Sequence, residues 1–255
     1  MNLKFSTGMK PKLSDLMKEL KQKANPEKAR LLMRFFKTGK GHYGEGDVFL
    51  GIMVPESRKL VGKYHELSLA DISKLIKSKY HEARLVALLI LVHKYNNASR
   101  EKVFVLKKNI FNFYLAHTKY INNWDLVDLS AGYIVGNYLY EKLKSPDVKR
   151  LGILEKLAKS GNLWERRIAI ISTFAFIYKG ESEWTFRIVR MLLKDRHDLI
   201  HKACGWMLRE VGKRVSEPKL RAFLDQYGPQ MPRTMLRYAI ERLPEKTRQM
   251  YLVKR

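Results

Sequence analysis

The segment "HEARLVALLIL", His81 to Leu91, indicates how this chain folds. Its apolar residues recur at spacings of three and four, which is the period of one face of an α-helix. The apolar run is too short for a membrane span, which needs about 18 uncharged apolar residues. The same period recurs in "PEKARLLMRFFK" from Pro26 and in "LADISKLIK" from Leu69, and strand-like alternation is nearly absent. The sequence therefore predicts an all-α protein.

Three short segments that combine a polar residue with a proline predict where helices begin. They are Asn25-Pro26, Ser145-Pro146-Asp147 and Ser216-Glu217-Pro218. A short polar side chain can accept a hydrogen bond from the first free N–H groups of a helix, and proline is tolerated in the first turn.

Five of the helical segments align on a polar residue that is followed within three positions by a small apolar one. The aligned residues are Arg84, Asp128, Arg167, Lys202 and Arg237, at steps of 44, 39, 35 and 35 residues. These steps fit two-helix HEAT-type repeats. Because one helix pair cannot bury both of its faces, stacked pairs would share a continuous core. We expect residues 1–255 to form a single HEAT-like α-solenoid domain, with the aligned positions along one concave groove.

The charge of the chain predicts a polyanionic partner. Fifty Lys and Arg stand against 25 Asp and Glu among 255 residues, so the formal net charge is +25 and the pI about 10.0. Charge of this size repels itself in a compact fold, and nucleic acid is the partner that we expect first, ahead of an anionic membrane surface. The N-terminal segment lacks the apolar run of a signal peptide, which predicts a cytoplasmic protein.

The aligned positions combine cations with one acid and two indoles. Four of the five are basic and suit a phosphate backbone, whereas Asp128 is acidic. Trp124 lies four residues before Asp128, and Trp206 lies four residues after Lys202, so each indole should share a helix face with its aligned residue. A groove that binds phosphates gains nothing from a carboxylate, which points to chemistry at Asp128.

The segments around these residues resemble the AlkD-type DNA alkylation repair proteins, which are HEAT-like DNA glycosylases. The resemblance rests on "FFKTGKGHYGEGDVFLGIMVPESRKLVGKY", "NWDLVDLSAG", "LWERRIAI" and "KACGWMLREVGKR", in a similar order and spacing, and it extends from about Asn25 to beyond Gly212. It implies excision of cationic N3- and N7-alkylpurines from double-stranded DNA, without a base swinging into a pocket.

The resemblance also implies roles for individual residues. Asp128 matches the catalytic aspartate, and Trp124 matches the tryptophan that contacts the lesion-bearing nucleotide. Arg167 matches an arginine that holds the DNA backbone, and Trp206 matches a second groove tryptophan. Phe35 stands where some members have tyrosine, which puts any contact of that hydroxyl in doubt here.

Physical chemistry supports the same reading of Asp128. An N3- or N7-alkylated purine is already cationic and leaves readily, and breaking its glycosidic bond builds positive charge on the deoxyribose. A nearby carboxylate stabilises that charge and can orient or deprotonate water. Indole faces attract cations by roughly 0.5–2 kcal/mol per contact. We expect Arg167 and other cations to keep Asp128 ionised by lowering its pKa.

Other patterns indicate no further chemistry. "GKGHYGEGD", Gly39 to Asp47, follows no strand and lacks the lysine and hydroxyl that end a P-loop, so it is interpreted as a loop that brings Lys40, His42 and Tyr43 near DNA. His197 and His201 lack an evident third ligand. Cys204 is the single cysteine and is expected in the core. We therefore expect no metal and no cofactor, and a monomer.

Each functional reading has an alternative. Asp128 could be a structural acid that pairs with a neighbouring helix, and Asp125 is interpreted as a solvated acid or as an acid of the first helical turn. Trp124 and Trp206 could be core residues, as expected for Trp164 and Trp184. The whole chain could be a non-catalytic protein that binds damaged or branched DNA, or a scaffold for acidic proteins.

Overall fold

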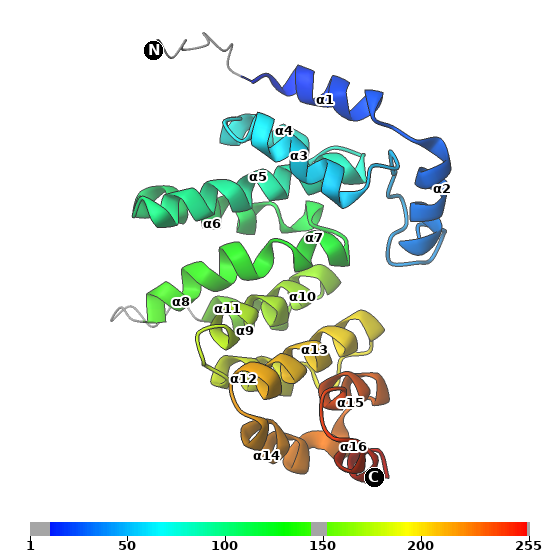
Figure 1. The fold of residues 1–255 in the computed structure, drawn as a ribbon, viewed down its shortest axis with the longest axis vertical. Helices are drawn as coiled ribbons and strands as arrows, with labels where there is room; N and C mark the ends of the chain where they lie inside the picture. Colours follow the sequence, from blue (N-terminus) through cyan, green and yellow to red (C-terminus); the bar gives the residue numbers. More distant parts are fainter. Residues whose placement is uncertain (1–10, 144–151, 254–255) are drawn as a thin grey trace, which may run out of the picture. The chain divides into compact units, whose positions relative to one another are not determined.

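The fold is built from helices, as the sequence predicts. The computed structural model describes residues 11–143 and 152–253. Within these ranges the β-structure is limited to an isolated parallel bridge between Val48 and Tyr80. None of the helices in the described ranges is long and apolar enough to cross a bilayer. Figure 1 shows the helices along the chain. They belong to two compact units, one ending at Glu101 and the other beginning at Lys102.

The first unit surrounds one buried helix. Its helices are α1 (Leu13–Gln22), α2 (Pro26–Phe35), α3 (Val54–Tyr64), α4 (Leu69–Ile76) and α5 (His81–Arg100). Every residue from His81 to Leu91 is buried, and α1, α3 and α4 all pack against α5. The apolar segment that indicated a helix is therefore the core of this unit, where burial of each large apolar side chain contributes about 1.5–3 kcal/mol.

A buried carboxylate ties the loop after α2 to α5. Glu82 accepts hydrogen bonds from three successive backbone N–H groups, those of Leu50 and Gly51 at 2.8 Å and of Ile52 at 3.1 Å. Glu82 is 1% exposed, so these donors replace the water that its charge has lost. The segment "GKGHYGEGD" lies in this loop, between α2 and α3, as predicted.

Arg84 does not lie on a surface, contrary to prediction. It is 4% exposed, and its Nη2 donates to Asp47 Oδ1 at 2.5 Å while Nη1 donates to Ser78 O at 2.9 Å. His81 Nδ1 lies 3.2 Å from the second oxygen of Asp47. The guanidinium of Arg84 thus neutralises Asp47, a buried acid of the same unit. Without this partner, the buried charge of Asp47 would destabilise the folded state. Arg84 is therefore engaged inside its own unit in this structure, and its contact with a phosphate stays a prediction.

The second unit holds the remaining helices, together with short 3₁₀ and π segments. Its elements are α6 (Phe104–Ala116), η1 (Thr118–Tyr120), α7 (Trp124–Asp128), the π-helix η2 (Gly132–Gly136), α8 (Asn137–Leu143), α9 (Gly152–Ala158), α10 (Leu163–Ser172), α11 (Phe174–Ile177), α12 (Glu183–Leu192), α13 (Asp198–Arg214), α14 (Glu217–Tyr227), η4 (Gly228–Gln230), α15 (Arg233–Ile240) and α16 (Glu245–Val253).

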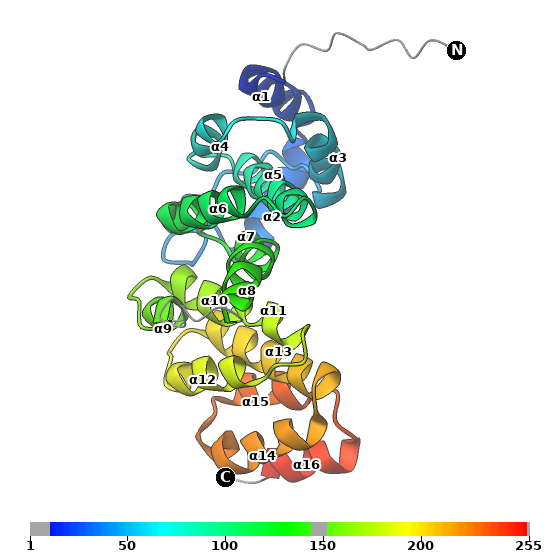
Figure 2. The ribbon, with the colours of Figure 1, turned by 90° about the vertical axis from the view of Figure 1, so that its left-hand side faces the viewer.

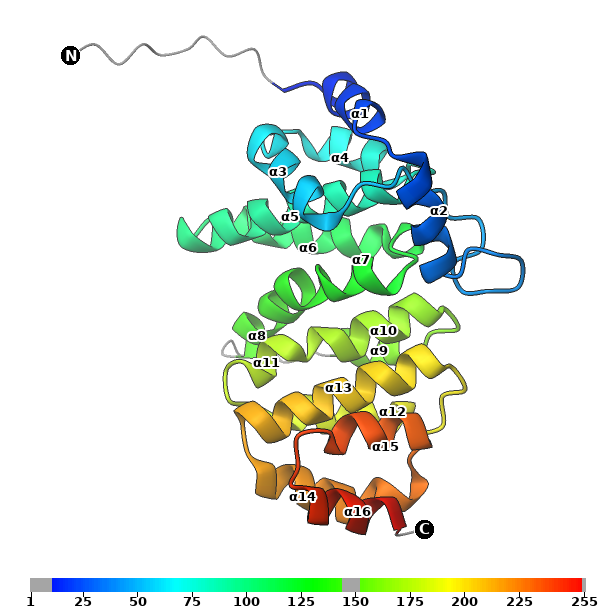
Figure 3. The same cartoon turned by 45° about the vertical axis from the view of Figure 1, so that its right-hand side comes forward.

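The aligned segments of this unit follow one another in space. Helices α7, α10, α13 and α15 pack each against the next, and Figures 2 and 3 show them in that order. Two glycines permit the closest approaches. A Cβ on Gly136 would lie 2.2 Å from Ser172 O, and a Cβ on Gly205 would lie 2.4 Å from Met235 O. Within this unit the four helices therefore pack in the order in which they occur along the chain.

Two of the three predicted helix starts are confirmed. Asn25 caps α2 by accepting a hydrogen bond from Lys28 N, and Ser216 caps α14 by accepting from Lys219 N. Residues 145–147 lie outside the described ranges. Cys204 is fully buried, as predicted.

Candidate active site

Asp128 is the last residue of the short helix α7. Asn123 starts this helix, where its side-chain oxygen accepts a hydrogen bond from Trp124 N at 2.8 Å. After the helix, the Ser130 hydroxyl donates to Leu126 O. The Tyr114 hydroxyl of α6 lies 2.9 Å from Ser130 Oγ. The turn that carries Asp128 is therefore fixed from inside the unit.

Arg167 of α10 holds both oxygens of Asp128. Its Nε donates to Oδ1 at 2.9 Å and its Nη2 donates to Oδ2 at 2.8 Å, so the pair is bidentate. Its Nη1 donates to Leu199 O of α13 at 2.6 Å. The side chain of Arg167 is 6% exposed and that of Asp128 18%. The paired bonds have the planar geometry that makes guanidinium–carboxylate contacts strong, so Arg167 fixes the carboxylate. Through these bonds and the bond to Leu199 O, Arg167 also joins α10 to α7 and to α13.

The pKa of Asp128 does not shift in the predicted direction. Burial raises the pKa of this carboxyl above its ordinary value, and a smaller repulsion from Asp125 adds to the rise. The charge and hydrogen bonds of Arg167 lower the pKa, as predicted, but they do not outweigh the loss of hydration. The bidentate contact with Arg167 favours an ionised carboxylate, because hydrogen bonds from a cation are strongest to a charged acceptor.

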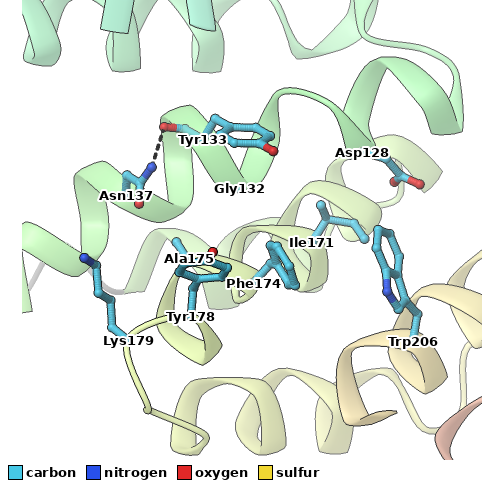
Figure 4. A pocket seen from close by; sticks show the side chains of 10 residues that line it. All are labelled: Asp128, Gly132, Tyr133, Asn137, Ile171, Phe174, Ala175, Tyr178, Lys179 and Trp206. Carbon is cyan, nitrogen blue, oxygen red and sulfur yellow. Dashed lines mark hydrogen bonds between the residues drawn. The ribbon is translucent and has the colours of Figure 1, made fainter. Parts of the chain in front are cut away.

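A pocket of about 490 Å³ opens beside Asp128. It is lined by residues from α7, η2, α8, α10, α11 and α13, together with the first residues after α11. They are Asp128, Gly132, Tyr133, Asn137, Ile171, Phe174, Ala175, Tyr178, Lys179 and Trp206. Figure 4 shows Asp128 and Trp206 toward one end of this pocket and Asn137 and Lys179 toward the other. The predicted acid and one predicted indole therefore border the same space.

The two predicted tryptophans differ in their surroundings. Trp206 lines the pocket, and its ring centroid lies 6.2 Å from that of Phe174. Trp124 is partly exposed on α7, one helical turn before Asp128. By contrast, Trp164 is buried, as expected for a packing residue. Asp125 lies in the first turn of α7, as predicted, but it is buried and its Oδ1 accepts a hydrogen bond from Leu126 N.

Comparison with known proteins identifies the family. Residues 16–243 match the family described as DNA alkylation repair enzyme. The chain belongs to this family. The match spans the acid, both tryptophans and Arg167, so all four residues lie within the part that the family shares.

A solved structure has a similar fold. It is described as "Predicted DNA alkylation repair enzyme from Enterococcus faecalis" and matches with a TM-score of 0.65 and 20% sequence identity, covering 87% of this chain and 97% of that one. At this identity the similarity concerns the fold alone. A comparison with curated proteins found no match.

The other predicted DNA contacts of this family member lie at different depths. Lys202 is partly exposed, and its Nζ forms an ion pair with Asp198 Oδ2 at 2.8 Å within α13. Arg237 is exposed on α15. Phe35, the last residue of α2 in the first unit, is 64% exposed and meets the ring of Phe36 edge-on at 5.1 Å. The Arg167 guanidinium, like that of Arg84, is engaged inside the protein.

Sequence reasoning missed the aromatic wall of the pocket. This wall is formed by Tyr133, Phe174 and Tyr178, which were not among the predicted site residues. Two of them are unusually exposed for their size in the structure, Tyr133 at 48% and Tyr178 at 67%. A helical period of 3.6 could not place Tyr133, because it lies in the π-helix η2, which interrupts that period. Within residues 11–143 and 152–253, His, Cys, Asp and Glu side chains form no group of three that could hold a metal ion.

Proposed function

We propose that this protein is a DNA glycosylase that hydrolyses the N-glycosidic bond of cationic N3- and N7-alkylated purines in duplex DNA. In this proposal the helices form a HEAT-like solenoid, and its basic concave face holds the DNA. The observation that carries the proposal is the pocket in which a fixed carboxylate, Asp128, borders the same space as the Trp206 indole. Membership of the DNA alkylation repair enzyme family supports alkylated DNA as the substrate.

The reaction breaks the bond between C1′ of the deoxyribose and N9 of the purine. The bonding electrons pass to the purine, which leaves as a neutral alkylated base, and positive charge develops on C1′ and the ring oxygen. Asp128 faces this charge and stabilises it, because a carboxylate in a site with little water interacts strongly with a developing cation. Water then adds to C1′ and loses a proton to Asp128 or to solvent, which leaves an abasic site.

The surrounding residues prepare Asp128 for this role. Arg167 acts as a positioning residue: it fixes the carboxylate plane and opposes the rise in pKa that burial causes. The Trp206 indole at the pocket, and the Trp124 indole one helical turn before the acid, supply faces that favour a cationic base over a neutral one. The alkylated base leaves without first entering an enclosed pocket.

Several residues outside the pocket contribute to binding in this proposal. Lys202 and Arg237 carry accessible charge on α13 and α15 and are assigned to phosphates of the DNA backbone. Phe35 is assigned to the lesion-bearing nucleotide, where its exposed ring can make apolar contacts without a hydroxyl. Arg84 is not assigned a DNA contact.

The alternative is a non-catalytic protein that binds damaged or branched DNA. One observation favours it: both oxygens of Asp128 already accept hydrogen bonds from Arg167, as they would if the acid served only to join α7 to α10. However, each carboxylate oxygen has a second lone pair, and the Asp128 side chain keeps 18% of its surface exposed.

The deciding experiment measures release of 7-methylguanine from methylated duplex DNA by the wild type and by Asp128→Asn. The substitution preserves shape and removes the charge that the reaction needs. We expect release by the wild type, a loss of at least about 100-fold in the variant, and similar DNA affinity for both proteins. Tight binding by the wild type without release of any alkylpurine would establish the non-catalytic alternative.

A further inference from the structure

Aromatic rings stand on two sides of the pocket, beyond Asp128. Tyr133 extends from η2, whereas Phe174 begins α11 and Tyr178 directly follows it. Figure 4 shows Tyr133 on one side of the gap and Phe174 with Tyr178 on the other. We call this part of the pocket, lined by Tyr133, Phe174 and Tyr178, the aromatic cleft.

The exposure of the two tyrosines is not explained by packing. Tyr133 leaves 48% and Tyr178 leaves 67% of its surface in solvent, whereas Tyr114 and Tyr138 of the same unit are fully buried. A ring that stabilises the core does so by leaving water. Single exposed aromatics are common on proteins, but two that converge on one pocket beside a predicted catalytic acid indicate a binding surface.

Cationic and amide groups accompany the rings. Arg214 of α13 lies with its guanidinium carbon 5.2 Å from the centre of the Tyr178 ring and 5.6 Å from that of Phe174. Glu210 accepts a hydrogen bond from Arg214 Nε at 2.7 Å and so holds it there. Lys179 and Asn137 line the same end of the pocket. The cations suit phosphate oxygens. The Asn137 amide nitrogen donates to Tyr133 O at 3.1 Å, and its oxygen can accept a hydrogen bond from the polar edge of a heterocycle.

These features together fit one class of occupant. A flat ring between two aromatic side chains, with an amide at its edge and cations beside it, describes a nucleobase with its attached phosphate. A fully paired base cannot enter, because its faces are covered by its neighbours in the duplex. The pocket volume of about 490 Å³ leaves room for a planar base.

We propose that the aromatic cleft binds an unpaired nucleobase of the DNA, stacked between Tyr133 and Tyr178, beside the nucleotide that Asp128 faces. The base is one that has lost its pairing partner through distortion of the duplex. This proposal rests on the DNA-binding part of the proposed function but not on its catalytic part. It gives the protein a preference for distorted DNA that depends on two tyrosine rings.

The test compares two labelled duplexes of equal length, one fully paired and one with a single bulged adenine, neither of them alkylated. Dissociation constants are measured by fluorescence anisotropy at one fixed salt concentration, because phosphate contacts make affinity salt-dependent. We expect the wild type to bind the bulged duplex about tenfold more tightly, as stacking of one base on an aromatic side chain predicts. A 2-aminopurine in the bulge should lose fluorescence on binding.

Variants separate stacking from other effects. Tyr133→Ala and Tyr178→Ala should lose most of the preference while keeping affinity for the paired duplex, and the corresponding Phe variants should retain it. Both side chains are exposed, so the replacements should leave the urea midpoint nearly unchanged. Phe104→Ala is the matched control, because Phe104 is a 43% exposed aromatic residue of α6 outside the pocket.

Three results would overturn the proposal: equal affinity of the wild type for both duplexes, equal weakening of both duplexes by Tyr133→Ala, or the same loss of preference in Phe104→Ala. Failure of the proposed function looks different. A protein that prefers the bulged duplex through its tyrosines but releases no alkylpurine would keep the aromatic cleft and lose the glycosylase assignment.

Discussion

Replacing Arg167 by methionine tests whether this residue exists to hold a charged Asp128. Methionine keeps much of the length and packing of the side chain but removes every donor. Asp128 would then be a carboxylate with little water and no partner, and α10 would lose its hydrogen bond to Leu199 O of α13. We expect Arg167→Met to lower the free energy of unfolding of the second unit.

The size of the loss follows from the burial of the pair. Removing one partner of a buried ion pair costs about 3–5 kcal/mol, because the other charge remains uncompensated. The Asp128 side chain is 18% exposed, so water reaches it and the lower value of about 3 kcal/mol applies. The lost hydrogen bond to Leu199 O adds about 1 kcal/mol. For a chain of this size, about 4 kcal/mol corresponds to a Tm lower by roughly 8–16 °C.

The loss should depend on pH with a definite sign. Burial already raises the pKa of Asp128, and removing Arg167 removes the main effect that opposes this rise. Above the folded-state pKa the carboxylate is charged in both states, and the folded state bears the full cost. As pH falls through that pKa toward the unfolded value of about 3.9, the folded state takes up a proton first, so the loss becomes smaller.

Urea unfolding followed by tryptophan fluorescence measures this effect in the relevant unit. The four tryptophans are Trp124, Trp164, Trp184 and Trp206, and all of them belong to the second unit. The double variant with Asp128→Asn provides the control, because it removes the uncompensated charge and should recover about 2–3 kcal/mol. If Arg167→Met is as stable as the wild type, or if the double variant is no more stable than the single one, the reasoning is refuted.

Three further predictions concern pH, close packing and the buried acid of the first unit. Because burial raises the pKa of Asp128, kcat/KM for alkylpurine release, corrected for spontaneous loss, should fall with decreasing pH at a higher pH than an ordinary aspartate would cause; a rate that stays constant down to about pH 4.5 would contradict this. Gly136→Ala should destabilise the second unit by about 2 kcal/mol, because the added Cβ would lie 2.2 Å from Ser172 O, whereas Gly132→Ala, with its nearest atom at 3.5 Å, should be neutral or slightly stabilising in the same urea assay. Glu82→Gln should weaken the first unit by about 2 kcal/mol, because charge-assisted bonds to backbone N–H groups are lost; faster amide hydrogen exchange at residues 50–52 would show it, and unchanged exchange would argue against it.

Local chemistry carried the prediction of the fold class and of the helix starts. The cap at Asn25 depends on a side chain and an N–H group three residues later, and the proline that follows it acts within the same turn. The burial of His81 to Leu91 follows from apolar character on nearly all sides of one helix. Such features depend on neighbours in sequence, so a single sequence contains the information.

The pairing of the basic residues could not be read in the same way. The sequence shows that residues 84 and 167 are arginines, but it does not show what they bind. Their partners, Asp47 and Asp128, lie 37 and 39 residues earlier in the chain. An arginine beside DNA and an arginine beside a buried acid look alike in a sequence. Only the packing of helices decides which of the two contacts is available.

The candidate site shows the same division. The sequence by itself determined the all-α fold and singled out Asp128, Trp124 and Trp206 by their spacing and by the resemblance of their segments. The tertiary structure decided that Tyr133 and Tyr178 share the pocket of Asp128. Tyr133 lies in the π-helix η2, where the 3.6-residue period does not hold, and Tyr178 directly follows a different helix, α11. It also decided the direction of the pKa shift, since the balance between lost hydration and a bidentate guanidinium depends on how deeply the folded protein buries the pair.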